Sequence, residues 1–269
     1  MRRGYWRRNW LELLGRGDSG GGSVDVDSSD CVILAIRLWP FLIPGLTICP
    51  IDERVCGNLM ADTVVVLDFE TTGLSPDMGD RAIEIGAVRL QHGKVVDRFQ
   101  ELMNPGLRIS RFIEDYTGIS NAMLSGASPC SEVMRRFADF VGDSNMVAHN
   151  ASFDKRFLDA EMDRISHDYV GEFACSLLAA RRIFQQAPDH KLSTLVNYVN
   201  IRSEGTFHRA LYDAEMTAKV WVVMMTNIRE QYLLEDIPFS LIQQLNKKPK
   251  KSVNTFLVKQ GKIAASFSG

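Results

Sequence analysis

Two carboxylates end a run of β-branched and aliphatic residues in the segment TVVVLDFETTGL, which begins at Thr63. Asp68 and Glu70 are separated by one residue, and side chains on a strand alternate between its faces, so both carboxylates point the same way. Carboxylates this close raise each other's pKa unless a cation lies between them. Mg²⁺ suits such a position because it binds a few carboxylate oxygens, water and substrate phosphate. The alternative is a chance D-x-E pair on a solvated strand end.

A third acid, Asp154, lies in the segment AHNASFD. A short apolar strand is expected to end at His149 and Asn150, and a helix to begin beside Ser152, so Asp154 falls in the first turn of that helix. The alternative interpretation is structural, because an acid in the first turn also compensates the helix dipole.

The segment HRALYDAE contributes His208 and Asp213, which are five residues apart. On one helix they would differ by about 140° and could not share a face. We therefore expect Asp213 on the helix and His208 on a mobile loop before it, from which the imidazole can reach the same site. Histidine titrates near neutral pH and can take a proton from water. The alternative is a capping or packing histidine.

The elements that must position these residues form an α/β pattern over residues 61–235. A strand-like start followed by alternating helices and strands indicates a mixed sheet covered by helices. We expect strands at 63–70 and 145–150, a hairpin over 82–105 that turns at His92 and Gly93, and a strand running into a helix over 173–184. Helices are expected at 131–142, 152–165, 190–199 and 209–233.

The two ends of the chain differ from this pattern. Residues 1–60 form an N-terminal extension without a catalytic motif, expected to be a disordered leader or a mis-set start, a membrane-associated segment at 31–51, or a small ordered extension. No stable membrane association is expected. Residues 236–269, which include KKPKK, are expected to form a basic flexible tail, either solvated or a tether for a partner protein or nucleic acid backbone.

Composition narrows the class of protein. The 269 residues carry a formal net charge of −2, with 45% hydrophobic and 24% charged residues, as in globular proteins. This charge argues against a long basic groove on duplex DNA, although a site that holds a few nucleotides with metal ions remains compatible. The five cysteines are scattered without a C-x-x-C pair, which indicates reduced thiols in a cytoplasmic protein and disfavours zinc.

The motifs DFETTG, HNASFD and HRALYDAE, in this order, resemble the three exonuclease motifs of the DEDDh 3′–5′ exonucleases. The resemblance is strongest to the epsilon proofreading subunit of bacterial DNA polymerase III and its stand-alone relatives, and it covers about 170 residues. The segments RAIEIGAVRL, FIEDYTGIS and HKLSTL also resemble the connecting segments of the family. The resemblance implies a ribonuclease H-like α/β fold, with a five-stranded mixed sheet flanked by helices.

The resemblance also implies roles for the site residues. Asp68, Glu70 and Asp213 would hold one Mg²⁺ or Mn²⁺, Asp68 would reach a second ion, and Asp154 would support that ion directly or through water. His208 would be the general base. The terminal nucleotide would contact Thr71, Thr72 and Leu74, with Asn150 and Phe153 shaping the same pocket; Leu74 and Phe153 are alternatively core residues. Thr117 stands where the epsilon subunit typically has a histidine, which leaves that substrate contact open.

Three functions compete on these grounds. The first is a metal-dependent 3′–5′ exonuclease that removes nucleoside 5′-monophosphates from single-stranded DNA, as a repair nuclease or as an editing subunit docked to a polymerase through the C-terminal tail. The second is an exoribonuclease that trims RNA 3′ ends, and the T-T-G and H-R-A-L residues favour the DNA-directed branch. The third is a non-catalytic module, which the complete set of four acids and a histidine argues against. Relatives include monomers and homodimers.

Overall fold

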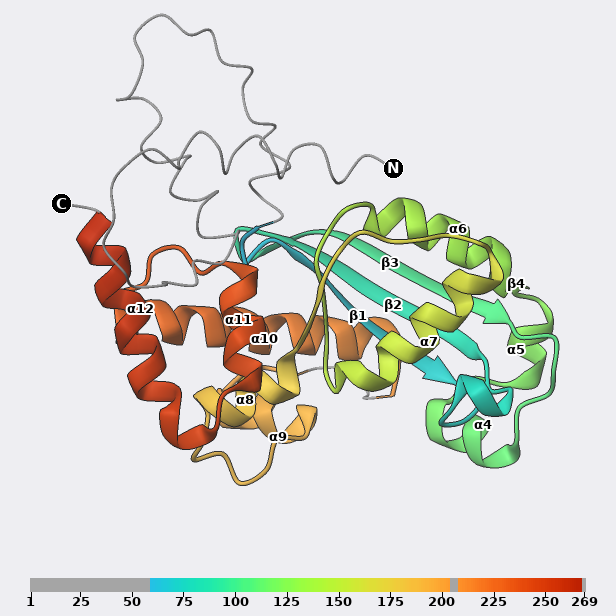
Figure 1. Cartoon of the computed structure of the whole chain (residues 1–269). Coiled ribbons are helices and arrows are strands. Elements are labelled where there is room, and N and C mark those ends of the chain that lie inside the picture. The colour runs from blue at the N-terminus through green and yellow to red at the C-terminus, as the bar shows by residue number, and fades with distance from the viewer. Residues whose placement is uncertain (1–58, 204–207, 268–269) are drawn as a thin grey trace, which may run out of the picture. The chain divides into compact units, whose positions relative to one another are not determined.

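The computed structural model describes residues 59–203 and 208–267, which lie within one compact unit (Figure 1). The N-terminal extension, with the candidate membrane segment at 31–51, lies outside the described residues. Within the described ranges, no helix combines the length and the apolar composition needed to cross a membrane.

A mixed sheet forms the centre of the described region, with strand order β4-β3-β2-β1-β5-β6. The long strands β1 (Val64–Thr71), β2 (Ala82–Gln91) and β3 (Lys94–Asn104) pair antiparallel, whereas β5 (Met146–Ala148) and β6 (Phe173–Cys175) extend the sheet in parallel from β1. The α/β class is as predicted. The expected five strands become six, because the two-residue strand β4 (Ser128–Pro129) pairs with the end of β3.

The β2–β3 hairpin turns at the predicted dipeptide. His92 and Gly93 both have positive φ angles, of 50° and 73°. Two consecutive left-handed residues are what the tightest hairpin connections require, because their twist matches that of the paired strands. The turn therefore sets the register in which β3 lies against β2.

The alternation of side chains along β1 divides the interior into two cores. Val64 and Val66 pack into the core that contains α8 (Ser176–Ile183), α9 (Leu192–Tyr198) and α10 (Ala210–Tyr232). Val65, Leu67 and Phe69 pack into the core with α6 (Cys130–Val141) and α7 (Ala151–Arg164). Because the period of a strand is two, Asp68 and Glu70 belong to the α10 side of the sheet.

A smaller cluster supports the region beyond the end of β1. The short helices α4 (Arg111–Thr117) and α5 (Asn121–Ser125) follow β3, and Leu124 of α5 packs with Ile119, which lies between the two helices, against Ile83 of β2. A single 3₁₀ turn, η2 (Pro76–Met78), follows β1 in the chain. In Figure 1, α4 lies beyond the arrowhead of β1.

The prediction of a flexible tail over residues 236–269 is wrong for the part that the structure describes. This segment forms α11 (Phe239–Lys247), the 3₁₀ turn η3 (Lys250–Ser252) and α12 (Val253–Phe267). Leu241, Ile242 and Leu245 of α11 are buried in the α10-side core, as are two residues of α12. The apolar residues at helical spacing on either side of KKPKK decide the outcome, because their burial stabilises both helices.

The start of the described region is joined to this C-terminal segment. The Ala61 amide donates to the Ile237 carbonyl over 2.8 Å, and the Phe239 amide donates to the Leu59 carbonyl over 2.7 Å. The indole of the fully buried Trp221 donates to the Ala61 carbonyl over 2.6 Å. Residues 59–61 and 237–239 therefore belong to the same folded layer, although the predicted boundaries at 61 and 235 separate them.

Candidate active site

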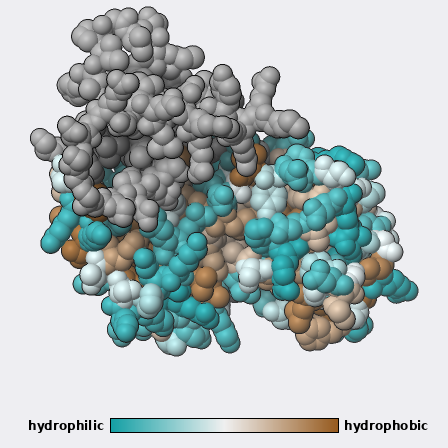
Figure 2. Space-filling model, in the orientation of Figure 1, coloured by the Kyte–Doolittle hydropathy of each residue, from teal (hydrophilic) through white to brown (hydrophobic). Residues whose placement is uncertain are grey.

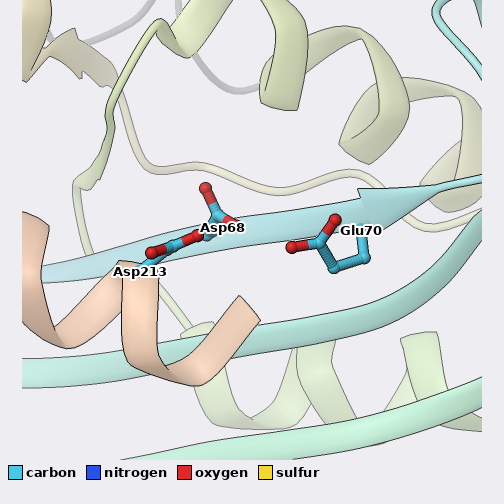
Figure 3. A group of neighbouring side chains, drawn as sticks. All are labelled: Asp68, Glu70 and Asp213. Atoms are coloured by element: carbon cyan, nitrogen blue, oxygen red, sulfur yellow. The ribbon is translucent and has the colours of Figure 1, made fainter. Parts of the chain in front are cut away.

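Three carboxylates meet between β1 and the first turn of α10. The ligand oxygens of Asp68, Glu70 and Asp213 all lie within 4.8 Å of one another. Figure 3 shows the carboxylates of Asp68 and Glu70 beside β1, and Asp213 on the neighbouring helix α10 pointing toward Asp68. Two residues from one strand and one from a helix more than 140 positions later thus converge on one point.

A glycine on β2 makes this approach of α10 possible. A Cβ atom placed on Gly86 would lie 2.0 Å from the backbone nitrogen of Leu211 and 2.2 Å from the carbonyl carbon of Ala210. Any side chain would therefore displace the start of the helix. Gly86 pairs with Asp68 in the β1–β2 ladder, so the helix crosses the sheet directly beside the carboxylates.

The two carboxylate oxygens of Asp213 have different surroundings. Oδ2 accepts a hydrogen bond of 2.9 Å from the His208 amide. Oδ1 is buried and has no hydrogen-bond partner among the described residues. A buried carboxylate oxygen normally finds a donor, because leaving it without one costs free energy. Its orientation toward two further carboxylates fits coordination of a cation.

The raised pKa values of the three carboxylic acids also indicate a cation site. Burial, followed by repulsion from Asp154, Glu70 and Asp213, raises the pKa of Asp68 well above its ordinary value. Burial, then Asp213, raises the pKa of Glu70 to about 8. The pKa of Asp213 is also raised, chiefly by burial. The three acids resist simultaneous ionisation because their negative charges repel one another. A divalent cation would offset that charge and stabilise all three as carboxylates.

Asp154 lies beside this cluster without belonging to its three-carboxylate core. It is buried in the first turn of α7, and its Oδ1 accepts a hydrogen bond of 3.2 Å from the Phe69 amide. Burial raises its pKa to about 7, against the lowering effect of the Phe69 hydrogen bond. Because Phe69 stands between Asp68 and Glu70, the contact fixes α7 to the strand segment that presents both ligands.

His208 is exposed and lies two residues before the first residue of α10. Its φ angle of 71° is unusual for a residue with a side chain. Its ring centroid lies 4.1 Å from that of Tyr116 on α4. The imidazole is thus outside the carboxylate core and rests on an aromatic ring across the site. The backbone amide of His208 donates to the Asp213 carboxylate. The spacing of five residues therefore places His208 in the loop before the helix, next to the first turn that carries Asp213.

The predicted nucleotide contacts separate into exposed and structural residues. Leu74 is 77% exposed, which excludes the core alternative for it. Asn150 is exposed at the start of α7, with a φ angle of 74°. Phe153 is half-buried, with its ring 5.0 Å from that of Phe157. Two of these three side chains are therefore open to a ligand, and Phe153 is partly so.

The three threonines have internal hydrogen bonds. The Thr71 hydroxyl donates to the Gly73 carbonyl over 2.6 Å, and the Thr72 hydroxyl donates to Asp80 over 3.2 Å. Both bonds shape the turn after β1. Thr117 is buried, and its hydroxyl donates to the Ile113 carbonyl and accepts from the Ile119 amide. Thr117 thus closes α4 and has little surface left for a substrate.

Sequence reasoning missed a partly buried ion pair next to the ligands. Glu84 is fully buried opposite Glu70, and Arg209 reaches it with two donors, at 2.7 and 3.1 Å. The Ala210 amide donates to the same carboxylate over 3.1 Å, so the pair fastens the start of α10 to β2. The available signal was the single charged residue within the apolar strand AIEIGAV.

Comparison with known proteins identifies the class to which this site belongs. The family model described as "Exonuclease" matches residues 65–221, which is more than half of the chain. The chain therefore belongs to this exonuclease family. It carries a metal-dependent 3′–5′ exonuclease domain of the DEDDh type, with the ribonuclease H-like fold that its motifs predict.

Among curated proteins, the chain is similar to PolC-type DNA polymerases III. The chain is 36% identical over 166 residues to a PolC-type DNA polymerase III of Caldanaerobacter subterraneus subsp. tengcongensis, covering 62% of this chain and 12% of the relative. It is 39% identical over 161 residues to the PolC-type DNA polymerase III of Oceanobacillus iheyensis, covering 60% of this chain and 11% of the relative. The match spans only about an eighth of the length of these relatives.

Two solved structures show the same fold. Exonuclease X in complex with 5′-overhanging duplex DNA is 27% identical, with a TM-score of 0.51, over 61% of this chain and 91% of that chain. The nuclease domain of 3′hExo, a DEDDh family member bound to rAMP, is 19% identical, with a TM-score of 0.54, over 62% of this chain and 92% of that chain.

Proposed function

We propose that this chain removes nucleoside 5′-monophosphates from the 3′ ends of single-stranded DNA, with two divalent metal ions and His208 as the general base. The observation that supports the proposal best is the convergence of Asp68, Glu70 and Asp213, with a buried Asp213 oxygen that has no partner among the described residues. Such a cluster is costly in a protein that only serves as a scaffold.

The donor set fits a hard divalent cation. Carboxylate oxygens are ligands for Mg²⁺ and Mn²⁺, and thiol or imidazole ligands are absent from the group among the described residues. Asp68, Glu70 and Asp213 would hold one ion, while Asp68 and Asp154 would serve the second. Bound there, the ions would acidify a water molecule and stabilise charge on the leaving 3′ oxygen.

His208 is the proposed proton acceptor for the attacking water. Its exposure and its place before α10 leave the imidazole free to move, while its amide stays bound to Asp213. The ring of Tyr116 limits that movement on one side. A neutral imidazole nitrogen can accept a proton from water.

Exposed rings beside the site favour a single-stranded substrate. Phe112 and Tyr116 on α4 stack with centroids 5.9 Å apart, and both are more than half exposed. Apolar side chains gather over α4 at the lower right of Figure 2. Such rings can stack on unpaired bases of any sequence. Exposed Leu74 and Asn150 would contact the terminal nucleotide. Trimming of RNA 3′ ends is the second candidate, since stacking alone does not detect a 2′-hydroxyl.

Cooperation with a DNA polymerase is part of the proposal, because the curated relatives are PolC-type DNA polymerases. The expected contact through residues 236–269 would use folded helices rather than a flexible tether, since α11 and α12 are packed into the core. A homodimer and a cytoplasmic location stay predictions.

The test is digestion of 5′-labelled single-stranded DNA and RNA, side by side, with Mg²⁺, Mn²⁺ or EDTA. Wild type is compared with His208→Ala and with the matched control His167→Ala, which changes an exposed histidine on the chain after α7. We expect a metal-dependent ladder that shortens from the 3′ end, lost in His208→Ala and kept in the control. A faster reaction on RNA would reverse the substrate assignment, and full activity of His208→Ala would remove its role as base.

A further inference from the structure

Six cations belong to α8 and to the segment between α11 and α12, two parts of the chain that contact each other. The Arg182 side chain donates from Nε to the Lys248 carbonyl over 3.0 Å, and the Gln185 amide donates to the Lys250 carbonyl over 3.3 Å. These contacts place the arginines of α8 next to the lysines of the turn. We call this group the basic corner; its members are Arg181, Arg182, Lys247, Lys248, Lys250 and Lys251.

The segments that form the basic corner contain no acidic residue that could offset its positive charge. Residues 239–267 contain six lysines and no acidic residue, and α8 contains two arginines and no acidic residue. Across residues 59–203 and 208–267, no carboxylate forms an ion pair with any of the six cations. In a chain of net charge −2, this is a strong local excess of positive charge.

The turn that carries the lysines is held in place by buried neighbours. Leu245 precedes it and Val253 follows it, and both are buried in the α10-side core. Lys248 is half-buried, with its Nζ 4.9 Å from the centre of the Phe256 ring, whereas Lys250 and Lys251 are exposed. Cations on a fixed turn lose less conformational entropy on binding than cations on a mobile tail.

The acidic active site cannot hold the phosphate backbone by itself. Its carboxylates repel phosphates, and the arginine next to them, Arg209, is already bound to Glu84. Cations on another surface can neutralise the rest of a strand. The basic corner supplies them on elements that fall largely outside the matched family region at residues 65–221.

A hydrogen bond joins α8 to the segment before α7, because the ring of His149 bonds through Nδ1 to the Ser176 hydroxyl over 2.9 Å. The ring of His149 bonds through Nε2 to the His190 carbonyl over 2.9 Å. Burial lowers the pKa of His149 to about 4, and the positive charge of Arg181 adds to this lowering. His149 is followed directly by Asn150 and by α7, which carries Asp154. A strand that leaves the site along this edge would run toward α8, which carries Arg181 and Arg182.

We propose that the basic corner binds the phosphate backbone of the substrate strand, upstream of the nucleotides that occupy the active site. This inference rests on the proposed exonuclease function. The recognised chemistry is a row of phosphates and not a base sequence, because lysine ammonium groups contact backbone phosphates without reading the bases.

The test compares Lys250→Ala/Lys251→Ala with a matched double variant, Lys94→Ala/Arg135→Ala. Lys94 and Arg135 are exposed cations on β3 and α6, and neither forms an ion pair with a described residue. Steady-state digestion uses single-stranded DNA of about 30 nucleotides and of about five nucleotides, the short one spanning little more than the active site. Binding of the long strand is measured separately in EDTA, by fluorescence anisotropy at several salt concentrations.

We expect the Lys250→Ala/Lys251→Ala variant to raise KM for the long strand about tenfold, with kcat unchanged and the short strand unaffected. In EDTA, the slope of log affinity against log salt should fall by about 1.4, because each phosphate that a lysine neutralises on a single strand contributes about 0.7 to that slope. The control variant should behave as wild type in both measurements.

Three outcomes would overturn the inference. Unchanged KM and salt slope would show that the corner does not bind the strand. Equal losses on long and short strands would show an effect on the active site. Intact DNA binding with loss of a copurifying polymerase would assign the corner to a protein partner. If wild type cleaves neither strand, the proposed function fails, while binding in EDTA still tests the basic corner.

Discussion

Glu84 lies directly opposite Glu70 in the pairing of β1 and β2, and both glutamates are buried. Arg209 approaches Glu84 from the residue before α10 and holds both of its carboxylate oxygens. One buried glutamate is thus neutralised by an arginine, and the other turns toward Asp68 and Asp213. The neutral pair fastens the helix whose first turn completes the carboxylate cluster.

Replacement of Arg209 by glutamine should therefore weaken both the fold and the metal site. Arg209→Gln leaves the buried Glu84 carboxylate short of donors, which should lower the free energy of unfolding by about 1–3 kcal/mol. The loosened start of α10 should also reduce the affinity for Mn²⁺, measured by isothermal titration calorimetry without DNA. The matched control is Arg98→Gln, which breaks the more exposed Arg98–Glu215 pair and should cost less than about 1 kcal/mol. Equal behaviour of the two variants would contradict this role.

The metal-free protein should lose stability as the pH rises. The pKa of Glu70 is raised from 4.5 to about 8, and that of Asp154 from 3.8 to about 7, in both cases chiefly by burial. Between these values the folded state binds more protons than the unfolded state, so the free energy of unfolding falls as the pH increases from about 4 to 8. Thermal unfolding in EDTA measures this trend.

Saturating Mg²⁺ or Mn²⁺ should reduce this loss, because the cation stabilises the ionised carboxylates. Glu70→Gln should flatten the trend in EDTA, whereas Glu132→Gln, which changes an exposed glutamate on α6, should leave it as in wild type. A Tm in EDTA that is independent of pH between about 4 and 8 would show that ionisation of these carboxylic acids does not destabilise the folded state.

Gly86→Ala should disrupt the site from the opposite strand. The new methyl group would lie 2.0 Å from the Leu211 nitrogen, so α10 must shift away from β2 and take Asp213 with it. We expect a loss of about 3 kcal/mol in the free energy of unfolding and weaker metal binding. At Gly126 the same change meets only the Met123 carbonyl oxygen at 3.7 Å, so Gly126→Ala should be tolerated. Normal metal affinity in Gly86→Ala would refute this account.

The helices after residue 236 should contribute to the stability of the whole domain. Leu245→Ala removes a fully buried side chain from α11, and we expect a cost of about 2–5 kcal/mol in the free energy of unfolding. Val258→Ala on α12, where the side chain is 39% exposed, should change it by less than about 0.5 kcal/mol. Chemical denaturation distinguishes the two. A Leu245→Ala variant as stable as wild type would restore the tail interpretation.

Local patterns were sufficient for the elements that carry the site. The alternation of residues 64–70 predicts a strand with Asp68 and Glu70 on one side, and the structure places both on the α10 side of the sheet. The hairpin at His92 and Gly93 follows from two residues that tolerate positive φ. These predictions depend only on the period of a strand and on turn geometry, which act over a few residues.

Contacts between distant segments were decided by the tertiary structure alone. Nothing in the spacing of residues predicts that Glu84 and Arg209 meet across 125 positions, or that Ala61 receives the indole of Trp221. The lysines at 247–251 suggested a flexible tail, yet the flanking Leu245 and Val253 are buried and hold the turn in place. Local sequence determines which residues can form a helix or a strand. Only the packed structure decides which of their surfaces find a partner, because burial depends on everything that lies around them.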